Sequence, residues 1–112
     1  MSAGLSSTEV ETLRVIHIDG CGAVVGITEH CSQAHDRVAV SLRKVIADAL
    51  RFDAHVLVFA HNHPSGDPEP SRIDIDTTRA IARIAAPLGI RVHDHVVTGG
   101  TRSFSFRSAG LI

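Results

Sequence analysis

Three residues, His61, His63 and Asp74, have the side chains and the spacing of metal ligands. His61 and His63 are two positions apart, so in an extended backbone their rings point to the same side. Pro64 favours that extended backbone, because the residue before a proline is biased away from helical geometry. Two such imidazoles can share a zinc ion at about 2.0–2.1 Å, and Asp74 adds an anionic ligand if the chain folds back. Three protein ligands with a fourth position open to water are typical of a catalytic zinc site.

A structural explanation of the same residues stays open at this point. A His-x-His pair alone is a weak indication of a metal site. Ser71 and Asp74 also match a capping box at the start of a helix, which needs no function. The two interpretations are compatible, because a capped helix start fixes the direction of the Asp74 carboxylate.

The elements that must position these residues follow from hydrophobic periodicity. Strands are predicted at 13–19, 23–29, 55–60, 90–97 and 103–107, and amphipathic helices at 41–52 and from 72 to just before Pro87. Residues 1–12 predict a flexible lead-in, and residues 30–40 predict a loop. The segment 61–70 holds three of the four prolines and predicts irregular structure between a buried strand and a helix. The order β-β-α-β-α-β-β predicts one mixed α/β domain over residues 13–112.

Composition excludes several classes of protein. The 112 residues are 44% hydrophobic and 21% charged, as in ordinary globular domains. A formal net charge of −1 gives no general attraction to phosphate backbones or anionic membranes, so nucleic acid is not an expected partner. The chain shows no apolar run of roughly 18–20 residues and no signal-peptide pattern at its start. We therefore expect a cytoplasmic protein in which Cys21 and Cys31 are free thiols.

The spacing His61-x-His63, ten further residues and then Asp74, with Ser71 three positions before it, resembles the motif of JAB/MPN (JAMM) metalloproteases. The fuller segments AHNHPSGDPEPSRIDIDTTR, LGIRVHDHVVTGG and FSFRSAGLI are similar to the RadC branch of that family. The resemblance runs from about Leu13 to Ile112. It implies a JAB/MPN-like fold and a zinc-dependent hydrolase of amide or isopeptide bonds, with peptide or protein substrates that include ubiquitin-like proteins.

The resemblance also implies roles for individual residues. His61, His63 and Asp74 match the zinc ligands. Ser71 matches the serine whose hydroxyl stabilises the oxyanion formed on the attacked carbonyl.

The family uses a glutamate from an early strand as the general base. Glu29, at the end of the second predicted strand, is the candidate by position, whereas Glu9 and Glu11 lie in the lead-in and fit poorly. The alternative for Glu29 is a solvated acid at a strand end. The pair Asp94-His95 matches a recurrent Asp-His of the RadC branch, and either residue could support the site indirectly.

Two other functions remain open. JAB/MPN domains also serve as non-catalytic interaction modules, although such modules usually lose ligands that this chain retains. A DNA-repair accessory role rests on the family name, since RadC proteins generally carry an N-terminal helix-hairpin-helix region and this chain shows nothing comparable. The near-neutral charge argues against DNA binding in the same way.

Overall fold

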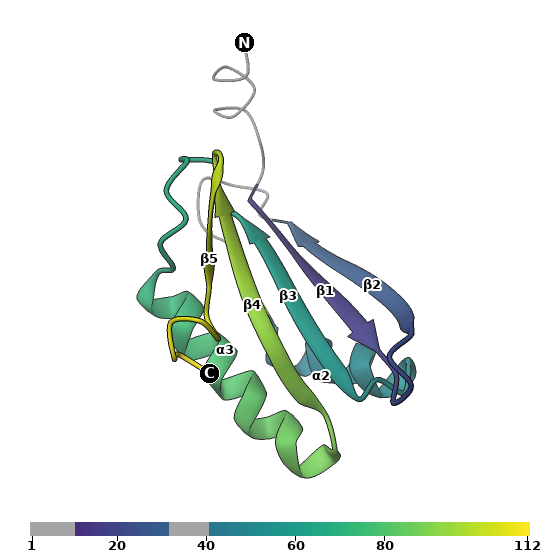
Figure 1. The fold of residues 1–112 in the computed structure, drawn as a ribbon. Coiled ribbons are helices and arrows are strands. Elements are labelled where there is room, and N and C mark those ends of the chain that lie inside the picture. Colours follow the sequence, from purple (N-terminus) through teal and green to yellow (C-terminus); the bar gives the residue numbers. More distant parts are fainter. Residues whose placement is uncertain (1–10, 32–40) are drawn as a thin grey trace.

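The structure, a computed structural model, describes residues 11–31 and 41–112. In these residues one five-stranded mixed sheet has the order β2-β1-β3-β4-β5, which Figure 1 shows side by side. The elements follow the chain as β1 (Thr12–Ile18), β2 (Val24–Cys31), α2 (Leu42–Arg51), β3 (Val56–Asn62), α3 (Arg72–Ala85), a 3-10 turn (Ala86–Leu88), β4 (Arg91–Gly99) and β5 (Arg102–Ser105). Only β3 and β4 pair in parallel, joined by α3, and the other neighbours are antiparallel. The predicted mixed α/β domain and its element order are confirmed.

Both helices pack against the same face of the sheet. The apolar spacing of α2 buries Val45 and Ala49, and that of α3 buries Ile81 and Ala85. These residues share one core with the alternate, helix-facing residues of the sheet, namely Leu13, Val15, Leu57, Phe59 and Val92. Neither α2 nor α3 is long and apolar enough to cross a membrane. The core therefore lies between a helical layer and one face of a sheet.

Most predicted strand ends shift by one or two residues, and the shift in β3 concerns the site. Strand β3 continues through His61 and Asn62, because both pair with β4 at Val97 and Thr98. This pairing outweighs the loop-like composition that follows. Strand β2 likewise includes residues 30 and 31, which were expected in a loop. Helix α3 ends at Ala85, before Pro87, as predicted. Residues 1–10 of the predicted lead-in and residues 32–40 of the predicted loop lie outside the described residues.

Candidate metal centre

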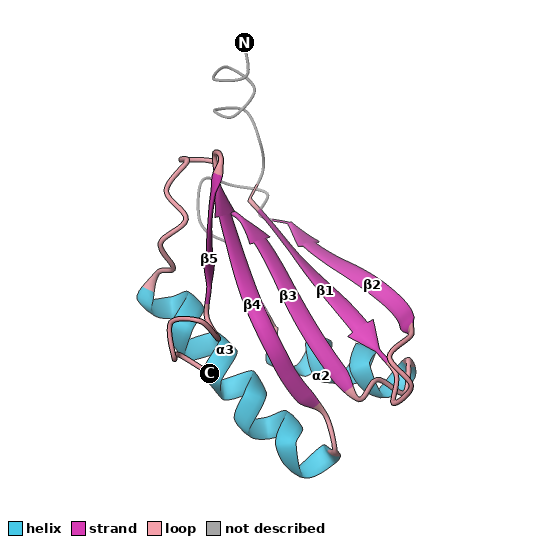
Figure 2. Cartoon of the chain, in the orientation of Figure 1, coloured by secondary structure: helices cyan, strands magenta, loops and turns pink. Residues whose placement is uncertain are grey.

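The pairing of β1 with β3 brings an acidic residue to the two histidines. Leu13 pairs with His61 in the antiparallel register, so Glu11, two positions before Leu13, runs opposite His63. Side chains two positions apart in a strand share a face, and both ends of this pair therefore face the helical layer. Figure 2 shows that β1 begins where β3 ends, at the edge of the sheet from which the loop leads to α3.

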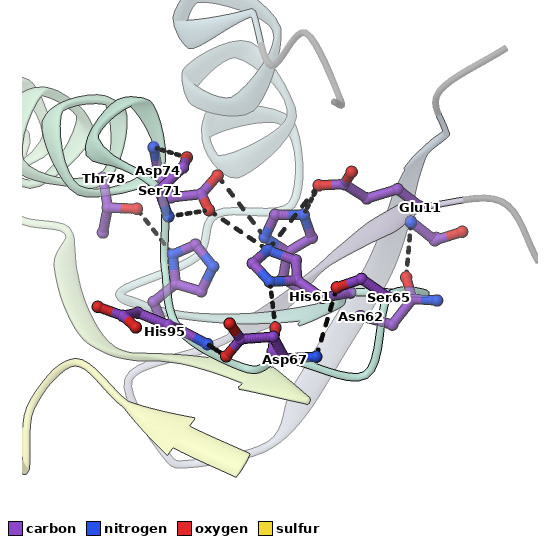
Figure 3. Close-up of polar contacts among 12 residues, drawn as sticks. Glu11, His61, Asn62, Ser65, Asp67, Ser71, Asp74, Thr78 and His95 are labelled. Carbon is purple, nitrogen blue, oxygen red and sulfur yellow. Dashed lines mark hydrogen bonds and ion pairs between the residues drawn. The ribbon is translucent and has the colours of Figure 1, made fainter. Parts of the chain in front are cut away.

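The His61 imidazole and the Glu11 carboxylate converge (Figure 3), and the His63 imidazole lies beside them. Glu11 Oε2 lies 2.6 Å from His61 Nε2 and 4.0 Å from His63 Nε2. One potential ligand atom from each of the three residues lies within 4.8 Å of the others. Two imidazole nitrogens and a carboxylate oxygen are donors that zinc and other divalent transition metals accept. This group could hold a metal ion.

Asp74 adjoins this group from the first turn of α3. Its Oδ2 lies 3.4 Å from His63 Nε2, and its Oδ1 lies 3.9 Å from His61 Nδ1. Ser71 caps the helix: its hydroxyl accepts from the Asp74 N–H at 3.0 Å, while Asp74 Oδ2 accepts from the Ser71 N–H at 2.9 Å. Burial raises the pKa of Asp74, but the bonds from Ser71 and the nearby histidines outweigh it, so the pKa is lowered. The cap thus keeps an ionised carboxylate beside the histidines.

The orientation of His63 fits metal binding. Its Nδ1 lies 2.9 Å from the carbonyl oxygen of Asp67, which can only accept a hydrogen bond. The proton therefore sits on Nδ1, and the lone pair of Nε2 points toward Glu11 and Asp74. A metal-ligating histidine typically has its other ring nitrogen held in this way. The residues present therefore fit a divalent metal bound through imidazole nitrogens.

A cleft opens beside the histidines. It has a volume of about 220 Å³ and is lined by Glu11, His63, Pro64, Ser65, Ser71 and Asp74. Two carboxylates, an imidazole and two hydroxyls thus share one solvent-accessible space.

Glu29, predicted as the general base, is not part of this group. It pairs with Arg14 across β1 and β2, with Glu29 Oε2 2.6 Å from Arg14 Nε. Arg14 lies on the sheet face opposite Leu13, so Glu29 points away from the helical layer and from His61. Its alternative interpretation, a solvated acid at a strand end, describes its surroundings better. We therefore replace Glu29 by Glu11 as the candidate base.

Glu11 precedes the first predicted strand in a polar segment, so its local sequence indicates no role at the site. The signal that could have identified it is the register of β1 against β3, which is a long-range pairing. Once Leu13 is placed opposite His61, alternation places Glu11 beside His63. No local pattern around Glu11 contains that information.

Asp94 and His95, although adjacent in sequence, have different surroundings. Asp94 holds the chain after β5, because its oxygens accept from the Ser105 hydroxyl at 2.7 Å and from the Arg107 N–H at 3.0 Å. His95 instead points into the core, where its ring lies 5.6 Å from that of His61. Burial, and the neighbouring His61, lower the pKa of His95 to about 3, although Asp74 and Asp94 oppose this shift. His95 is therefore neutral at physiological pH.

Comparison with known proteins identifies the family of this chain. The sequence profile of the RadC-like JAB domain matches residues 1–111. The chain is 42% identical over 102 residues to a UPF0758 protein of Rhodobacter capsulatus, covering 91% of this chain and 48% of that protein. It is 37% identical over 108 residues to a UPF0758 protein of Ruegeria pomeroyi, covering 96% and 48%. A UPF0758 protein of Salinibacter ruber is 35% identical over 108 residues, with coverage of 96% and 46%.

The chain thus spans about half the length of the curated relatives it matches. The profile match nevertheless extends over nearly all of its residues, and the observed sheet and helices agree with it. The chain belongs to the RadC-like JAB domain family.

Proposed function

We propose that this domain is a zinc-dependent hydrolase of amide or isopeptide bonds. The observation that carries the proposal is the convergence of Glu11, His61, His63 and Asp74 beside one cleft, which is lined by Glu11, His63, Asp74 and Ser71. His61 and His63 would bind the ion through Nε2, and Asp74 would be the third ligand. A bound zinc ion supplies an acidified water and polarises the scissile carbonyl.

Glu11 and Ser71 would supply proton transfer and charge stabilisation. Glu11 is close enough to the histidine nitrogens to accept a proton from the attacking water and to deliver it to the leaving amine nitrogen. The Ser71 hydroxyl accepts a bond from the Asp74 N–H and still has its own proton to donate. The Ser71 O–H would donate a hydrogen bond to the oxygen on which negative charge develops.

The substrates we propose are cytoplasmic peptides or proteins, with ubiquitin-like conjugates as a subset. The open cleft of about 220 Å³ supports a polypeptide segment rather than an enclosed small molecule. Its lining of two acidic side chains disfavours nucleic-acid phosphates.

Metal content and turnover test the proposal together. We expect about one zinc per chain by elemental analysis and hydrolysis of fluorogenic peptide or lysine-isopeptide substrates. Glu11→Gln should retain zinc and lose roughly 10²- to 10⁴-fold in turnover, because the amide keeps the shape but cannot take the proton. Glu29→Gln is the matched control on the same sheet and should leave turnover unchanged.

The opposite results are equally informative. Purified protein that binds no zinc, with unchanged stability in His61→Ala, would overturn the proposed function. Zinc binding with no turnover on any of these substrates would favour a non-catalytic module. Loss of turnover in Glu29→Gln but not in Glu11→Gln would restore the original assignment of the base.

A further inference from the structure

A second, larger groove lies along the C-terminal half of α3. Its volume is about 690 Å³, and it is bounded by α3, the turn from α3 into β4 and the C-terminal segment. Figure 1 shows the C-terminal end of the chain beside α3. This volume lies within the range of roughly 300–1,000 Å³ that is usual for binding sites. None of the residues of the candidate metal centre lines the groove, so any role it has is separate from that centre.

Much of the lining of this groove is apolar. The small side chains of Ala82 and Ala86 line it on the helix side, and Leu111 and Ile112 line it from the C-terminal segment. Arg79 Nε donates to the Leu111 carbonyl oxygen at 2.8 Å, which ties the C-terminal segment to α3. Apolar surface of this kind gains free energy by covering aliphatic side chains of a partner.

The charged side chains of the groove are all basic. Arg79, Arg83 and Arg91 line it and are exposed, and no acidic side chain does. Within the part of the chain that the structure describes, no carboxylate forms an ion pair with these three residues, whereas Arg72, earlier on α3, pairs with Asp76 at 3.5 Å. The whole chain has a formal net charge of −1, so this positive charge is a local feature of the groove.

The two chemistries together define a partner. A guanidinium group binds a carboxylate through paired, charge-assisted hydrogen bonds. In an extended peptide alternate side chains point to opposite sides, so aliphatic residues can cover the apolar surface while acidic residues reach the arginines. Nucleic-acid phosphates would satisfy the arginines but leave the apolar surface uncovered.

We propose that this groove is a docking site for an acidic polypeptide segment in which carboxylate and aliphatic side chains alternate. The site extends beyond the proposed hydrolase, because it uses neither the metal centre nor its cleft.

Fluorescence anisotropy with a labelled, end-blocked Glu-Leu-Glu-Leu-Glu peptide tests the docking site. The full chain, kept in a chelator at low salt, should bind this peptide, and added salt should weaken the binding because the arginines are exposed. The peptides Gln-Leu-Gln-Leu-Gln and Glu-Ser-Glu-Ser-Glu each lack one of the two chemistries, and both should bind more weakly.

Arginine variants locate the binding in the groove. Arg83→Gln combined with Arg91→Gln should weaken the peptide affinity roughly 10-fold, because each exposed ion pair contributes up to about 5-fold. Arg43→Gln combined with Arg102→Gln changes the net charge equally at exposed positions outside the groove. This control should leave the affinity unchanged.

A variant that fills the groove keeps the test decisive if the arginine variants do not fold. Ala86→Trp places a large ring in the groove from an exposed position and should abolish peptide binding. Ala47→Trp, at an exposed position on α2, should leave binding intact.

Several results would overturn this proposal. They are no peptide binding up to about 1 mM, or equal affinity in the two arginine double variants. Oligothymidylate that binds more tightly than the peptide, with the same loss in the groove variants, would make this a nucleic-acid site. A dimer that sediments as one species and dissociates in Ala86→Trp would make the occupant a second copy of this chain. His61→Ala should retain peptide binding, so the docking site and the proposed hydrolase can fail separately.

Discussion

At the scale of single residues, Ser71 combines a structural and a chemical role that can be separated by experiment. Its hydroxyl caps α3 by accepting from the Asp74 N–H. On the other helix Ser41 makes the same kind of cap, accepting from the Lys44 N–H at 3.2 Å. Ser41 does not line the cleft, whereas Ser71 does. The two serines therefore form a matched pair.

Ser71→Ala and Ser41→Ala should each lower the free energy of unfolding by about 1 kcal/mol, because each loses a helix cap. Only Ser71→Ala should also lower kcat, by roughly 10²- to 10³-fold, since it loses the donor to the oxyanion. Urea unfolding and turnover on a peptide substrate measure the two effects. Equal turnover in both variants would show that Ser71 acts only as a helix cap.

At the scale of elements, the loop of residues 63–71 is held against the end of β4. The His63 N–H donates to the Thr98 carbonyl at 2.7 Å. A Cβ atom on Gly99 would lie 2.7 Å from backbone atoms of Gly66, Asp67 and Pro68. Only glycine allows this close approach. The approach brings the carbonyl oxygen of Asp67 within hydrogen-bond distance of His63 Nδ1.

Gly99→Ala should therefore displace the loop, weaken zinc binding and cost roughly 1–3 kcal/mol of stability. Gly22→Ala is the control, because Gly22 has a φ of 89° with open space around it. That substitution strains the hairpin turn by about 1 kcal/mol without touching the loop. Calorimetric zinc titration of both variants distinguishes them, and equal zinc affinity would show that the loop does not depend on the close approach.

At the scale of the whole molecule, a buried histidine links stability to pH. His17 is fully buried. Burial lowers its pKa, Asp48 opposes this shift, and Arg51 and His30 add to it. The unfolded chain therefore takes up a proton near pH 6.5 that the native state does not bind. Stability is fully present above that pH and decreases as the pH falls toward the native pKa.

We expect the melting temperature of the metal-free protein, measured in a chelator, to fall from pH 7 to pH 5. One histidine contributes a slope of at most about 1.4 kcal/mol per pH unit. His17→Phe should reduce this dependence by the share of one histidine, because His95 keeps its own lowered pKa. His93→Phe, at an exposed position, should leave it unchanged. A parallel pH profile for His17→Phe and the wild type would contradict the argument.

Local patterns in the sequence predict the element order, the end of α3 before Pro87, and the grouping of His61, His63, Ser71 and Asp74. These features depend on periodicity, proline geometry and contacts within about a dozen positions, all of which are local. The position of Glu11 at the histidines, and of Glu29 away from them, depends on the pairing of strands. Glu11 precedes β1 and Glu29 lies within β2, and the sheet face that each one reaches depends on the register of the sheet, which a one-residue shift would invert. The surroundings of His95 also depend on tertiary packing, because Thr78 meets its ring only after α3 packs against β4, and Phe106 only after β4 pairs with β5.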